Sequence, residues 1–125
     1  MFLSLLLTDM IRLAPMSEWQ TAEEFQQYLN TPFRVLVEAP KPIEITLVAV
    51  EARPVDASEE QGMERFSVFF HGSPEFLLPQ SMYRLAHPEM GEFDIFLVAI
   101  AQDAQGYRYE AVYNYYKADA QAKTS

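Results

Sequence analysis

The chain contains no cysteine in its 125 residues. A disulfide, a thiolate nucleophile and a cysteine-ligated metal are therefore excluded, and we expect a cytoplasmic location. Glycine is also scarce, and its four residues stand singly, so the sequence has no glycine-rich phosphate-binding loop. Histidine occurs only at His71 and His87, without the ligand spacing that is typical of a metal site. These absences predict a protein without a metal or another cofactor.

Basic residues are few as well, with nine Lys and Arg against 18 Asp and Glu, which gives a net charge of −9. Such a chain is repelled by phosphate backbones and by anionic membranes, so we expect neither nucleic acid nor a membrane as a partner. The charge serves solubility or complements a basic protein surface. No Gly-x-Ser-x-Gly nucleophile motif is present. We therefore expect no catalytic residues and no enzyme activity.

What the sequence does contain is enough apolar surface for one core. Half of the residues are apolar and 14% are aromatic, and the length suits a single domain. We expect a β-domain over residues 17–114 and a flexible tail over 115–125. Residues 1–16 form an N-terminal extension, which is either an amphipathic helical segment or the product of a start codon placed too early. Its apolar run, Met1–Leu7, is too short to span a bilayer.

A helix is predicted over residues 21–29. Thr21 and Glu24 form a capping-box pattern, in which the threonine hydroxyl accepts from the glutamate amide. Phe25 belongs to an apolar stripe at helical spacing that would cover the sheet. Asn30 is suited to end the helix in a left-handed conformation, and Pro32 prevents its continuation.

Alternating apolar residues predict six strands, near 33–38, 43–52, 64–71, 82–87, 92–101 and 107–114. Proline or glycine separates them, and Gly91 and Gly106 are expected to supply the positive φ of hairpin turns. The predicted fold class is mainly β. We expect a small six-stranded, largely antiparallel barrel or curled sheet with one N-terminal helix packed on it.

Two apolar segments are candidates for an interface. The first lies in the loop between Pro74 and Pro79 and either closes the open end of the barrel, which we favour, or forms an exposed patch. The second follows the last strand, where two tyrosines extend an aromatic run whose earlier members are expected to form cross-strand pairs. The candidate interface residues are Phe76, Leu77, Leu78, Tyr115 and Tyr116. The histidines are expected to hydrogen-bond to the backbone of turns.

The chain resembles a small bacterial domain family of unknown function. The family pattern has an "LPQxxYRLxHPxxG" centre and a "YEAV(F/Y)N" end. The matching residues here are Leu78-Pro79-Gln80, Tyr83-Arg84-Leu85, His87-Pro88, Gly91, Tyr109-Glu110-Ala111-Val112 and Asn114. The resemblance covers about residues 21–114 and implies a single domain without established site residues. Members of the family that the chain resembles are often encoded beside phage-tail-like collar proteins, which implies an accessory role in a tail-like assembly.

We therefore expect a non-catalytic protein-interaction or assembly module, which binds a protein partner or associates with itself. The alternative is a β-barrel that binds a small apolar ligand in its interior. Enclosed ligand sites usually need about eight strands, and six strands argue against this alternative.

Overall fold

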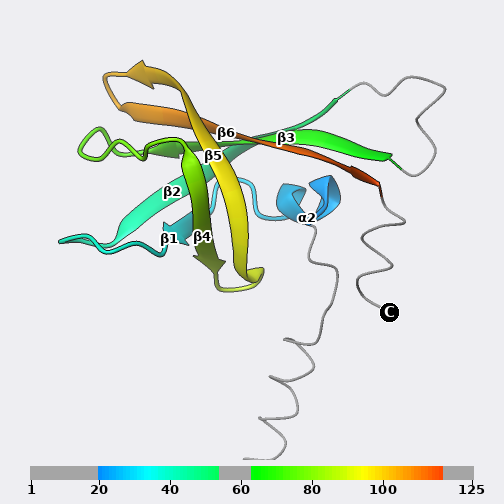
Figure 1. Ribbon diagram of the computed structural model, residues 1–125, viewed down its shortest axis with the longest axis horizontal. Helices are drawn as coiled ribbons and strands as arrows, with labels where there is room; N and C mark the ends of the chain where they lie inside the picture. The colour runs from blue at the N-terminus through cyan, green and yellow to red at the C-terminus, as the bar shows by residue number, and fades with distance from the viewer. Residues whose placement is uncertain (1–19, 54–62, 117–125) are drawn as a thin grey trace, which may run out of the picture.

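A computed structural model describes residues 20–53 and 63–116. Our expectations for the N-terminal extension and for residues 117–125 lie outside the described residues. Within them, one short helix precedes six strands, as predicted (Figure 1). In chain order the elements are α2 (Ala22–Gln26), β1 (Pro32–Val35), β2 (Ile43–Ala52), β3 (Met63–Gly72), β4 (Ser81–His87), β5 (Gly91–Asp103) and β6 (Gly106–Tyr116).

The six strands form a closed antiparallel ring in the order β1-β2-β3-β6-β5-β4. The expected mainly-β class is thus confirmed, although the ring is not a regular barrel. The closing contact is short and pairs Arg34 with Ala86 and Val35 with Leu85. β5 changes its pairing partner along its length. Its first half pairs with β4, and its second half, from Val98 onward, pairs with β6.

β5 and β6 separate before Val98, so the ring is split on one side. The β3–β6 ladder nevertheless continues without a break from Gly72↔Tyr107 to Met63↔Tyr116. β2, β3 and β6 therefore extend past the ring as a three-stranded sheet, with α2 beside it (Figure 1). The last strand continues beyond Asn114, where we had placed the start of a tail, and the two added tyrosines keep the alternation of the strand.

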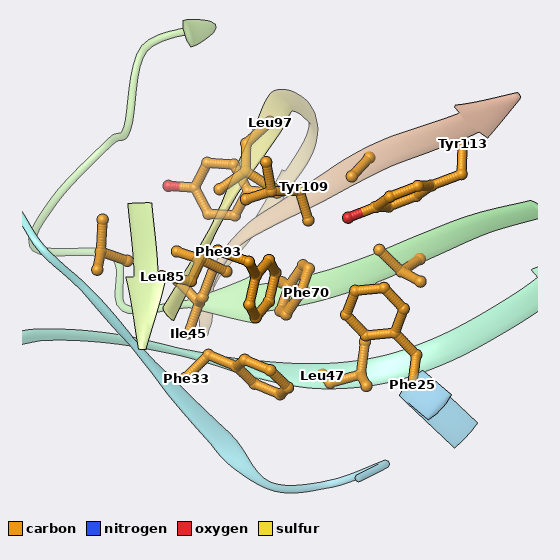
Figure 2. Close-up of a cluster of buried hydrophobic side chains, with 14 of the residues drawn as sticks. Phe25, Phe33, Ile45, Leu47, Phe70, Leu85, Phe93, Leu97, Tyr109 and Tyr113 are labelled. Carbon is orange, nitrogen blue, oxygen red and sulfur yellow. The ribbon is translucent and has the colours of Figure 1, made fainter. Parts of the chain in front are cut away.

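The core is a cluster of aromatic and aliphatic side chains from every element. Phe25 of α2 lies at the split and is fully buried. Its ring centroid lies 5.9 Å from that of Phe93 on β5 and 5.7 Å from that of Tyr113 on β6. It also packs against Phe33 and Phe66, and Figure 2 shows its ring directed into the cluster. One side chain thus joins the two strands that do not hydrogen-bond to each other at this level.

The helix is shorter than predicted, because it ends at Gln26 and the chain then forms turns. Its N-terminus follows the capping pattern, since the Glu24 amide donates to Thr21 Oγ1 at 3.1 Å. Asn30 adopts the predicted left-handed conformation, with φ of 65°. Its amide donates to the carbonyl of Leu47 on β2 at 2.7 Å. Pairing of this turn with β2 replaces the last turn of the expected helix.

Candidate functional site

The loop between β3 and β4 closes one end of the ring. Leu78 is buried, and its amide donates to the hydroxyl of Tyr109 at 3.0 Å. The same hydroxyl donates to the carbonyl of Phe76 at 3.4 Å, and Tyr83 donates to the carbonyl of Pro79. Burial raises the pKa of Tyr109. Leu78 thus has the closing role that we favoured, while Phe76 is half-buried and Leu77 is 53% exposed.

The second candidate segment divides in the same way. Tyr115 is buried, because odd-numbered residues of β6 face inward, and its hydroxyl donates to the carbonyl of Gln20 at 2.7 Å. Tyr113 donates to the side-chain oxygen of Gln20 at 2.9 Å. Burial raises the pKa of Tyr115 to about 12. Tyr115 is therefore an internal residue and not a surface contact, whereas Tyr116 is 52% exposed.

The two candidate segments do not form one surface. Leu78 contacts Tyr109, and Tyr116 lies seven residues further along the same strand. At the usual rise per residue, the Cα atoms of Tyr109 and Tyr116 are about 23 Å apart. The exposed residues Leu77 and Tyr116 therefore lie toward opposite ends of β6 and do not share one patch.

Sequence reasoning missed a pair of exposed apolar residues on the outer face of the ring. Met82 on β4 and Phe96 on β5 are direct cross-strand partners, and their side chains are 61% and 46% exposed. We call them the outer apolar pair. The alternation of buried and exposed residues along β5 could have predicted the exposure of Phe96. Phe93 and Ile95 are buried, so the residue after Ile95 must face outward.

An ion pair lies beside the outer apolar pair. Arg84 and Asp94 are the next outward-facing partners on the same two strands. The guanidinium donates through Nε and Nη2 to the two carboxylate oxygens at 3.0 and 3.2 Å. Hydrogen bonding from Arg84 lowers the pKa of Asp94. Because both side chains are exposed, this bidentate pair orders the surface more than it stabilises the fold.

His87 has a structural role at the turn between β4 and β5. Its Nδ1 accepts from the amides of Glu89 and Met90 at 3.1 and 3.3 Å. Nδ1 is therefore unprotonated, which assigns the proton to Nε2, 3.1 Å from Thr31 Oγ1. Burial lowers the pKa of His87. The expected bond to a turn backbone is thus confirmed for this histidine.

His71 differs, because its ring faces a side chain and not a turn backbone. Its Nε2 lies 3.7 Å from Asp103 Oδ1, in the turn between β5 and β6. The Asp103 carboxylate accepts from the amides of Gln105 and Gly106, and these bonds lower its pKa. Our expectation of a turn-backbone bond was therefore wrong for His71.

Two hollows lie among the described residues, and neither combines reactive groups. A cavity of about 90 Å³ lies between the start of β2 and the loop that holds Leu78. A shallow groove of about 340 Å³ crosses β1, beside Arg34, Glu44 and His87. Both nitrogens of His87 already have partners. Within residues 20–53 and 63–116, no three metal-binding side chains converge.

The fold and surface define a small mainly-β domain whose polar side chains serve turns and surface pairs. No helix among the described residues is long and apolar enough to cross a membrane. The model of a family described as a domain of unknown function, DUF6916, matches residues 20–113, and the chain belongs to this family. No curated protein and no solved structure shows significant similarity to the chain.

Proposed function

We propose that this protein is a non-catalytic interaction or assembly module that binds another protein through the outer apolar pair. The observation that supports the proposal is the exposure of Met82 and Phe96 as direct neighbours on a sheet face. Methionine and phenylalanine are enriched in protein interfaces and have no role in the core from this position. The Arg84–Asp94 ion pair beside them supplies a polar rim.

The surroundings of the pair favour a localised contact. Leu77, also exposed, lies in the loop that leads into β4, only five residues before Met82. A chain of five residues spans at most about 17 Å, so both lie within the width of one standard interface. The net charge of −9 favours a partner with a basic rim around an apolar contact.

The setting that the family resemblance implies is an accessory role in a phage-tail-like assembly. The polar side chains described above serve turns and a surface ion pair, which is what a domain that acts by contact requires. The alternative, a binder of small apolar ligands, has weaker support. Pockets for small molecules usually have at least about 300 Å³ of concave space, and the larger hollow here is an open surface groove beside charged residues.

The test is affinity purification from the source organism, with mass spectrometry of the co-purifying proteins. We compare the wild type with the double variant Met82→Asp/Phe96→Asp. The control is Ile100→Asp, which places one aspartate on an exposed apolar residue elsewhere on β5. All three proteins should fold, because each replaced side chain is about half exposed and its loss should cost about 1–2 kcal/mol or less, against a total stability of about 5–15 kcal/mol; circular dichroism of each protein checks this.

A specific partner should be recovered with the wild type and the control. Its recovery should fall at least about tenfold with the double variant, because interface anchors contribute about 2 kcal/mol or more each. Equal recovery with all three proteins, or no specific partner for the wild type, would contradict the proposal.

A further inference from the structure

The end of β6 is a sheet edge that the ring does not close. β6 pairs with β3 over its whole length, but its other edge pairs with β5 only as far as Glu110. No described strand lies along that second edge beyond Glu110. Free edges of this kind are templates for pairing with another chain.

This edge lacks the features that protect sheet edges in other proteins. Residues 111–116 contain no proline and no charged side chain, although the chain as a whole has 27 charged Asp, Glu, Lys and Arg residues. Valine and tyrosine, which favour strands, make up most of the segment. The comparable edge of β5 carries Glu92 and Asp94, and that of β2 lies beside α2. The end of β6 is therefore the edge best suited to strand addition.

We propose that the partner at this edge is a second copy of the chain, paired antiparallel with β6 about a two-fold axis. The inference deepens the proposed assembly function and rests on it. The outward-facing residues of the uncharged segment are Val112, Asn114 and Tyr116. Centring the axis on Asn114 brings Val112 of each copy against Tyr116 of the other. Both side chains are exposed, at 54% and 52%, and aromatic–β-branched pairs of this kind stabilise sheets.

Charge also favours self-pairing at this point. Two copies with a net charge of −9 repel each other over most of their surfaces, but the segment that meets here is neutral. The nearest outward-facing cation is Arg65 on β3, which donates to Asn114 Oδ1 at 3.2 Å. In the dimer the Cα atoms of the two Arg65 residues would be three strand spacings apart, about 14 Å. Each guanidinium lies closer to the axis, because it binds Asn114, so it is the uncharged segment and not these cations that favours the contact.

Cysteine cross-linking tests the register directly, because the chain has no cysteine of its own. Asn114→Cys places two thiols opposite each other on the axis and should form a disulfide-linked dimer on mild oxidation. Val112→Cys is the matched control on the same face of the same strand. In the proposed register its two copies are four residues out of step, about 13 Å apart, and a disulfide cannot bridge Cα atoms more than about 7 Å apart.

Sedimentation velocity tests the association without cross-linking. The wild type should shift from monomer to dimer as its concentration rises, because a contact along one short edge is small. Val112→Lys/Tyr116→Lys should remain monomeric at the highest concentration, since charge on an edge opposes pairing. Met82→Lys, equally exposed but remote from the edge, should behave like the wild type.

Two results would overturn the inference. These are a wild type that stays monomeric throughout, and equal cross-linking of Asn114→Cys and Val112→Cys. Capture of a partner through the outer apolar pair would still stand in these cases, so failure of the self-pairing is distinguishable from failure of the proposed function.

Discussion

The substitution Phe25→Ala tests whether one side chain of α2 holds the split ring together. Phe25 is fully buried and contacts four aromatic rings, with centroid distances from 5.7 to 6.4 Å. Losing about 150 Å² of buried apolar surface, at about 25 cal/mol per Å², destabilises by about 4 kcal/mol. This value lies within the range of about 3–5 kcal/mol that buried Phe→Ala changes show.

The measurement is urea unfolding followed by far-ultraviolet circular dichroism. Phe96→Ala is the matched control, because it removes the same ring from a position that is 46% exposed. By the same area argument it should cost about 1–2 kcal/mol. The reasoning is refuted if Phe25→Ala lowers the free energy of unfolding by less than about 1 kcal/mol, or by no more than the control does.

Three further predictions concern polar and backbone features. His87 is held neutral with a lowered pKa, so its stabilising contribution is complete above pH 6.5 and is lost as the pH falls below that value; urea unfolding at a series of pH values should show less acid destabilisation for His87→Gln. Tyr109→Phe leaves the buried Leu78 amide without its acceptor and should cost about 1–3 kcal/mol in urea unfolding; an effect equal to that of Tyr107→Phe would contradict this. Gly106→Ala places a Cβ 1.8 Å from a backbone oxygen and should prevent folding, which circular dichroism would show as loss of the strand signal. Gly91→Ala places a Cβ with no atom within 4 Å, at φ of 80°, and should lower the free energy of unfolding by only about 1–2 kcal/mol.

Most of the fold could be predicted from sequence because two-residue periodicity and turn residues specify strands locally. β2 begins and ends as expected, and the positive φ values of Gly91 and Gly106 follow from their place in hairpin turns. The family motifs have a structural explanation as well. Tyr109 and Tyr83 bond to the backbone of the β3–β4 loop, and His87 bonds to the backbone of the turn between β4 and β5.

The surface could not be predicted equally well, because it depends on contacts between distant residues. Leu78 is buried by Tyr109, which lies 31 residues away, and no local pattern shows that contact. The split between β5 and β6 lies where β5 changes its partner from β4 to β6. The position of this change depends on how all six strands pair, which no local pattern in the sequence specifies. Burial of Tyr115 is different, since continued alternation from Tyr113 already indicated it.

The central claim is that the protein acts by contact through the outer face of β4 and β5. Site-specific photo-crosslinking in the source organism tests it most directly, with the photoreactive residue placed at Met82, at Phe96 and, as a control, at the exposed Glu51 near the end of β2. We expect a discrete cross-linked protein from the first two positions and none from the control. The claim is contradicted if positions 82 and 96 give no product, or the same products as position 51.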